Sequence, residues 1–128
     1  MDEEMLNIPP IILKWSDWVS WDALTVDVRH GGGVRVPNHE PGVYEVKYGD
    51  SEKRLTIGKA SDLRMRIKQG LVKGKAKHSS GSKIRAGEEV SKLVVRWAIT
   101  DRPAAAEEEL HRRYKAKFGE LPKYTEHT

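Results

Sequence analysis

The sequence predicts an α/β (α+β) fold, in which a small three-stranded antiparallel sheet is flanked by helices and preceded by a tryptophan-containing N-terminal extension. Runs rich in β-branched and aromatic residues predict strands over residues 43–48, 54–58 and 92–100. A chain of 128 residues has room for one domain with a single core. We therefore expect an extension over residues 1–40 and a folded domain over residues 41–128.

The extension is marked by tryptophans at every third position, Trp15, Trp18 and Trp21. This spacing predicts a turn of α- or 3₁₀-helix with the indoles along one side, packed onto the main domain. A protein-partner surface within residues 1–36 is the alternative. Farther along, valines alternate on both sides of a glycine triplet, which predicts a short hairpin or flap over residues 26–36.

The first two strands are joined by turn residues, and we expect the second strand to end at Gly58. Ser61 or Asp62 can then cap a helix. The apolar side chains of that helix fall four residues apart on one face, at Leu63, Ile67 and Leu71.

A basic loop rich in glycine and serine, residues 73–82, precedes the third strand and is expected to be mobile without a ligand. Thr100 or Asp101 begins the last helix, and Pro103 fits its first turn. Gly119 ends that helix.

The net charge of +4 conceals a strong asymmetry along the chain. Residues 1–52 carry 4 basic and 10 acidic side chains, residues 53–85 carry 11 basic and 1 acidic, and residues 86–128 carry 8 of each. Such a basic block repels itself, and phosphate is its natural counter-charge. The charge distribution therefore predicts a nucleic-acid partner.

The composition also excludes several classes of protein. The chain has no cysteine, which excludes disulfides, thiolate zinc sites and cysteine nucleophiles. No apolar run approaches the ~18 residues of a membrane span, and the acidic N-terminus is unlike a signal peptide. We therefore expect a cytoplasmic protein that does not associate with membranes.

Two tripeptides carry a family resemblance. Gly42-Val43-Tyr44, followed after eleven residues by Thr56-Ile57-Gly58, resembles the signature of the GIY-YIG nuclease superfamily. The next segment, Gly58 to Ile67, is similar to the one that follows the second signature in nucleotide-excision-repair incision subunits. It places Arg66 where those proteins have their helix arginine.

The C-terminal part extends the resemblance, which covers about residues 41–125. Glu107, with Leu110 three positions later, matches the metal-binding glutamate of the family. Residues 121–125 are similar to the family's ending, although asparagine usually stands at the position of Thr125.

The resemblance implies an α/β nuclease domain that hydrolyses DNA phosphodiester bonds with Mg²⁺ or Mn²⁺. It implies that Glu107 binds the metal, Tyr44 activates or orients water, and Arg66 with Lys59 holds the phosphate. These roles agree with general chemistry, since one carboxylate with water and phosphate oxygens suits Mg²⁺ and a guanidinium fork suits phosphate. Glu108 is the alternative metal ligand.

The basic segment 73–85 is expected to contact the DNA backbone without reading base sequence. Its candidate side chains are Lys73, Lys75, Lys77, His78, Lys83 and Arg85. The other histidines, at positions 30, 39, 111 and 127, show no metal-ligand spacing.

The main departure from the family pattern is Thr56, which stands where most members have tyrosine. Gly70 likewise replaces an aromatic residue or histidine. Either Tyr44, or the nearby Tyr48, acts as the base, or the domain is a weak or inactive nuclease that binds nucleic acid. The sequence leaves both alternatives open.

Overall fold

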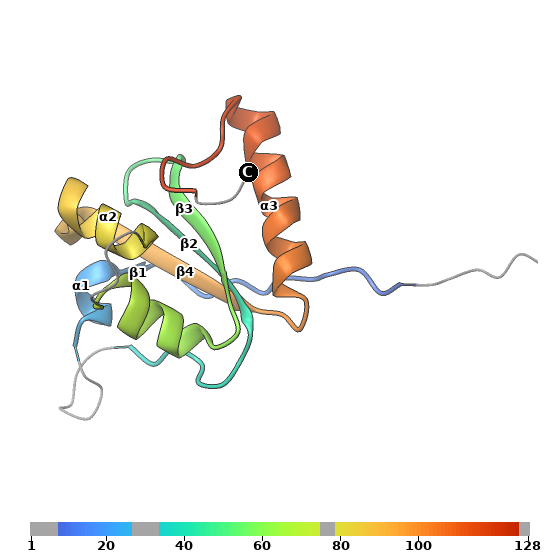
Figure 1. Cartoon of the computed structure of the whole chain (residues 1–128), viewed down its shortest axis with the longest axis horizontal. Coiled ribbons are helices and arrows are strands. Elements are labelled where there is room, and N and C mark those ends of the chain that lie inside the picture. The colour runs from blue at the N-terminus through green and yellow to red at the C-terminus, as the bar shows by residue number, and fades with distance from the viewer. Residues whose placement is uncertain (1–7, 27–33, 75–78, 126–128) are drawn as a thin grey trace, which may run out of the picture.

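The computed structural model describes residues 8–26, 34–74 and 79–125. A four-stranded antiparallel sheet separates helix α3 on one face from the π-helix η2 and helix α2 on the other (Figure 1). The strands are β1 (Val19–Ser20), β2 (Gly42–Tyr48), β3 (Arg54–Ala60) and β4 (Leu93–Ile99). The helices are α1 (Trp21–Leu24), η2 (Met65–Leu71), α2 (Ser80–Gly87), the 3₁₀ turn η3 (Val90–Lys92) and α3 (Pro103–Phe118).

The strand order is β1-β4-β2-β3, so β2 is central and β3 forms one edge of the sheet. The three predicted strands are present, but the predicted count of three is wrong because the extension adds β1 along β4. The second predicted strand also continues past Gly58 to Ala60, where it pairs with Gly42. Both differences arise from backbone pairing between distant segments, which side-chain pattern alone does not reveal.

The main core lies between the sheet and the η2 face. Leu63, Ile67 and Leu71 are completely or almost completely buried there, which confirms the predicted apolar face. Asp62 caps the helical residues 63–64 that lead into η2, since its Oδ1 accepts a hydrogen bond from the amide of Met65 at 3.2 Å. The helix widens into a π-helix, in which amides bond to carbonyls five residues earlier.

Helix α2 begins inside the segment that was predicted to be a loop. Its first residues, 80–82, were predicted to belong to the flexible segment 73–82, but they are helical. The reason is local: Ser79 caps the helix by accepting a hydrogen bond from the amide of Ser82 at 3.1 Å. Residues 75–78 of the predicted loop lie outside the described residues.

Helix α3 covers the opposite face of the sheet, where Val43, Ala98 and Ala106 form a smaller core. It begins with Pro103 in its first turn, as expected. Gly119 ends it with a φ of 78°, a left-handed conformation that glycine adopts without steric cost. No helix in the described part of the chain is long and apolar enough to span a membrane.

The N-terminal extension packs against both faces of the sheet. Trp15 contacts the smaller core on the α3 face, whereas Trp21 is 2% exposed in the main core. Trp15 and Trp18 are extended, so the predicted helical turn is wrong for them, and only Trp21 begins a helix. Residues 34–36 form no strand, and the rest of the predicted hairpin, residues 27–33, lies outside the described residues.

Two of these indoles, Trp15 and Trp18, lie against cationic side chains. Arg96 lies 4.1 Å from the ring centre of Trp15 and 4.6 Å from that of Trp18. Arg96 and Arg54 both donate to the buried carboxylate of Glu45, at 2.8 and 3.0 Å. This pairing keeps the buried charge satisfied and gives Trp18 a flat surface to stack on.

A second polar cluster ties the C-terminal segment to the domain. The carboxylate of Glu88 accepts hydrogen bonds from Tyr48 at 2.6 Å, from Lys123 at 2.7 Å and from Tyr124. Although burial opposes it, these donors lower the pKa of Glu88 to about 2. The hydrogen bond between Tyr48 and Glu88 raises the pKa of the Tyr48 phenol. The Glu88 cluster is therefore a set of charge-assisted bonds in its ionised form.

Replacing Glu88 should destabilise the fold in a pH-dependent way. Its pKa is lowered on folding, so its contribution is complete above the unfolded pKa of ~4.3 and is lost as the pH falls toward about 2. Glu88→Gln should reduce the free energy of unfolding by about 1.5–3 kcal/mol at pH 7. The difference from wild type should shrink toward zero near pH 2, as measured by urea denaturation across this range.

The neighbouring Glu89→Gln variant is the control. Glu89 pairs with Lys92 on the surface, where both side chains are about two-thirds exposed (68% and 69%), so the change should have little effect at any pH. A pH-independent loss of stability in Glu88→Gln would contradict the assignment.

Candidate active site

A small cavity of about 90 Å³ opens at the outer edge of β3, between η2 and α2 on one side and α3 on the other. Five elements contribute to it. Its lining residues are Tyr44, Thr56, Ile57, Gly58, Lys59, Arg66, Ser80, Glu107 and His111. All four predicted catalytic residues therefore line one cavity, although they are up to 63 positions apart in the chain, from Tyr44 to Glu107.

Tyr44 reaches the cavity because Gly58 has no side chain. The two residues are paired across β2 and β3. A Cβ atom on Gly58 would lie 2.5 Å from both Cζ and Oη of Tyr44, far inside van der Waals contact. The phenol thus lies over the backbone of the edge strand, with only 6% of the residue exposed. The position of the Tyr44 ring therefore depends on glycine at position 58.

The edge of β3 is covered over the residues that precede Gly58. The amide of Tyr124 donates to the carbonyl of Leu55 at 2.8 Å, and His111 Nε2 lies 2.9 Å from the carbonyl of Ile57. Beyond Ile57 the edge borders the cavity at Gly58 and Lys59. The open part of the strand edge is therefore the part that carries the candidate residues.

Three consecutive glutamates in α3 have different surroundings. Glu109 pairs with Arg112 and Arg113, whose hydrogen bonds lower its pKa to about 2. Glu108 is exposed and lies outside the cavity, whereas Glu107 is half-buried and lines it. Among the described residues no hydrogen bond or ion pair engages the Glu107 carboxylate. The structure thus places Glu107, rather than Glu108, beside Tyr44.

Two cations and a helix terminus face this carboxylate. Lys59 and Arg66 are exposed at the mouth of the cavity, and neither side chain is held in an ion pair within the described ranges. Ser80, the first residue of α2, also lines the cavity, so the positive end of a helix dipole is nearby. The site combines one carboxylate with several positive groups.

Thr56 and Tyr48 differ in their relation to the cavity. Thr56 is 2% exposed, and its hydroxyl lies 3.4 Å from the carbonyl of Tyr124, a weak interaction that directs it toward the C-terminal segment. Tyr48 is not a lining residue, and its phenol donates to Glu88. Of the two tyrosines considered as a base, only Tyr44 is in the cavity.

His111 is a lining residue that the sequence analysis missed. Its position, four residues after Glu107, places both on one face of α3. The spacing of four residues could have indicated that Glu107 and His111 share a site. The contact of His111 with the carbonyl of Ile57 could not be predicted, because Ile57 belongs to a strand 54 positions away.

The predicted DNA-binding residues differ in their exposure and in their contacts. Lys73 and Lys83 are exposed. The guanidinium of Arg85 instead donates to backbone carbonyls at and beyond the end of η2, those of Gly70, Leu71, Lys73 and Gly74. Lys75, Lys77 and His78 lie outside the described residues. Arg85 therefore has a structural role in this segment, whatever else it contacts.

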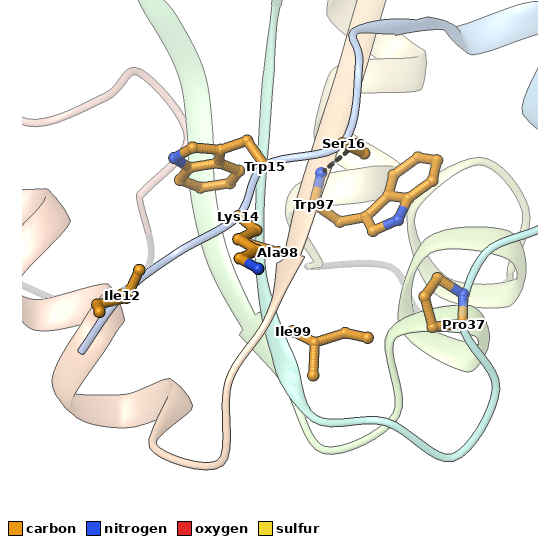
Figure 2. A pocket seen from close by; sticks show the side chains of 8 residues that line it. All are labelled: Ile12, Lys14, Trp15, Ser16, Pro37, Trp97, Ala98 and Ile99. Atoms are coloured by element: carbon orange, nitrogen blue, oxygen red, sulfur yellow. Dashed lines mark hydrogen bonds between the residues drawn. The ribbon is translucent and has the colours of Figure 1, made fainter.

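The cavity is continuous with two shallower hollows. One, beside η2, shares Arg66, and the other, along α3, shares Lys59, Glu107 and His111. A separate apolar groove lies at the opposite edge of the sheet, between the extension and β4 (Figure 2). It shares no lining residue with the cavity. Compared with this groove, the hollows at the β3 edge gather the groups suited to phosphate chemistry.

No protein-family model, curated protein or solved structure shows significant similarity to this chain. The resemblance to GIY-YIG nucleases therefore rests on the quoted motifs alone. The function has to be inferred from the cavity and its residues.

Gly58→Ala should displace the Tyr44 ring and destabilise the protein by about 1–3 kcal/mol, the usual cost of overpacking. The matched control is Gly49→Ala, because a Cβ there has ordinary contacts of 3.8 Å and longer. Denaturation of Gly58→Ala in a Tyr44→Ala background should show a smaller loss, since the clash is gone. Additive effects of the two substitutions would contradict this account of the motif.

Comparing Arg85→Ala with Lys83→Ala tests the structural role of Arg85. Arg85→Ala should lower the thermal midpoint, because four carbonyls lose their donor. Lys83→Ala, at an exposed position of the same helix, should leave stability unchanged. Normal stability in Arg85→Ala would contradict the structural role.

Proposed function

We propose that this protein is a metal-dependent endonuclease that hydrolyses DNA phosphodiester bonds at the β3 edge. The observation that carries the proposal is the cavity shared by Tyr44, Lys59, Arg66 and Glu107. These groups supply what phosphodiester hydrolysis needs: a carboxylate for a metal, cations for the phosphate and a phenol near the reacting water.

The donor set is suited to a hydrated divalent ion. No cluster of three or more metal-ligating side chains occurs among the residues placed by the structure. Mg²⁺ and Mn²⁺ need no such cluster, since they are often bound by one or two carboxylates, with water and phosphate oxygens completing the coordination. Glu107 would hold the metal, whose chemistry is to polarise the phosphate and acidify bound water.

The chain's own residues have separate tasks in this proposal. Arg66 and Lys59 would bind the non-bridging oxygens of the phosphate and stabilise the charge that develops on them. Tyr44 would orient the attacking water through its phenol. One P–O bond forms to the water oxygen as the P–O bond to the leaving oxygen breaks, and the proton lost by water passes to solvent.

The electrostatics support a polyanionic substrate. Arg66 borders the hollow along η2 beside Asp62, and Lys115 borders the hollow along α3, where Glu108 and the Glu109-paired Arg112 also lie, so a cation lies on each side of the cavity. A strand that follows these hollows would contact them through phosphates, which gives binding without sequence preference.

A non-catalytic DNA-binding module is the second candidate, and Thr56 favours it. Threonine is too weak an acid to replace tyrosine in proton transfer, and here its hydroxyl is buried beside the Tyr124 carbonyl. The two candidates share the basic surface and differ only in chemistry. Cleavage therefore distinguishes them.

The test is nicking of supercoiled plasmid with Mg²⁺ or Mn²⁺. Glu107→Gln should reduce the cleavage rate on the order of 10²–10³-fold, because it removes the metal ligand. DNA binding measured in Ca²⁺ should be nearly unchanged. The matched control is Glu108→Gln, which changes an exposed neighbour that borders the hollow along α3 but not the cavity, so it removes no metal ligand and should cleave at close to the wild-type rate.

Two outcomes would overturn parts of the proposal. If the wild-type protein binds DNA in a salt-sensitive manner and cleaves none, the binding module is correct. If Glu107→Gln, purified identically, cleaves at the wild-type rate, the metal site lies elsewhere.

A further inference from the structure

His111 and Glu107 lie one helical turn apart in α3, and both line the cavity that contains Tyr44. Residues four apart on an α-helix have Cβ atoms about 5–6 Å apart on the same face. Both side chains also border the hollow along α3. The carboxylate and the imidazole therefore face one small, half-buried volume.

We propose that Glu107 and His111 form a two-residue metal site, in which Glu107 supplies an oxygen and His111 supplies Nδ1. This inference rests on the proposed function, because it assumes that the metal is bound at Glu107. The two-residue site goes beyond the proposed function because it adds a nitrogen ligand, and this ligand changes the class of metal that the site prefers.

The contact of His111 with β3 prepares the ring for this role. The carbonyl of Ile57 can only accept, so His111 Nε2, 2.9 Å away, must carry the proton. In the neutral ring the lone pair is then on Nδ1. Metal-binding histidines usually donate their second N–H to a carbonyl or carboxylate, which fixes the tautomer and the ring orientation. The Ile57 carbonyl provides this partner from the edge strand.

Other features of the site agree with this role. His39, the other histidine among the described residues, has a side chain 84% exposed and pairs with Asp62, away from the cavity. The Glu107 carboxylate has no competing ion pair within the described ranges, whereas Glu109 is bound by two arginines. The cavity thus retains one carboxylate and one oriented imidazole for a ligand.

A mixed nitrogen and oxygen set predicts a preference among metals. Imidazole suits transition-metal ions such as Zn²⁺ best; Mn²⁺ is bound mainly by oxygen ligands but accepts an imidazole nitrogen more readily than Mg²⁺, which prefers oxygen ligands alone. We therefore expect the wild-type protein to bind Mn²⁺ more tightly than Mg²⁺, and we expect His111 to be the source of the difference.

The experiment measures metal binding by the full chain in the absence of DNA. Mn²⁺ affinity is followed by electron paramagnetic resonance, and Mg²⁺ affinity by competition. His111→Gln keeps an amide that can donate to Ile57 but removes the imidazole, and circular dichroism checks its fold. It should weaken Mn²⁺ binding on the order of tenfold or more and change Mg²⁺ binding less. His39→Gln is the matched control and should change neither.

A second readout identifies the ligand directly. Zn²⁺, which is diamagnetic, should shift the NMR signal of the His111 Nδ1 nitrogen through direct coordination, and Glu107→Gln should weaken this effect. An unchanged Mn²⁺ affinity in His111→Gln, a parallel loss of both metals, or unaffected His111 signals would each overturn the two-residue site.

The two proposals fail separately. A protein that binds Mn²⁺ through His111 but cleaves no DNA supports the metal site and overturns the nuclease. A protein that cleaves DNA, while His111→Gln keeps the wild-type metal preference, overturns the two-residue site alone.

Discussion

The contact between Tyr44 and Gly58 is the constraint on which the site depends. The phenol lies across the backbone of the edge strand because no Cβ stands in its way. Pairing of β2 with β3 sets the register that brings the two residues opposite each other. With any larger residue at position 58, the ring would have to leave the cavity or the strands would have to separate.

An edge strand normally presents unpaired backbone groups to solvent, and proteins protect such edges. Here the protection is divided among the C-terminal segment, which bonds to Leu55, and His111, which bonds to Ile57. The Glu88 cluster in turn holds the C-terminal segment in place. The same contacts that cover the edge therefore delimit the cavity at Gly58 and Lys59, so stability and function are coupled at this edge.

Much of the fold followed from local pattern. The buried face of Leu63, Ile67 and Leu71, the strand that became β4, and the last helix were all confirmed, since each depends on spacing within one segment. The fourth strand and the extended path of Trp15 and Trp18 were not predicted. Both depend on contacts with β4 and its Arg96, which local periodicity does not encode.

The candidate site likewise combines residues that the sequence identified with residues that only the tertiary contacts revealed. The family resemblance identified Tyr44, Lys59, Arg66 and Glu107, and the structure places them around one cavity. It did not identify His111, because the spacing from Glu107 acquires meaning only once the Ile57 carbonyl is beside it. The basic charge of segment 73–85 placed Arg85 among the predicted DNA-binding residues, whereas its guanidinium donates to backbone carbonyls at and beyond the end of η2.

The sequence by itself determined the three longer strands, the helical segment after β3 and the last helix, the basic middle segment and the residue types available for phosphate chemistry, because these follow from composition and short-range spacing. The tertiary structure decided which glutamate faces the cavity, which tyrosine shares it, and which cations remain unpaired. Those outcomes depend on strand register and on competition among charged partners. Glu109 and Tyr48 are held by partners elsewhere, while Glu107 and Tyr44 meet at the edge of β3.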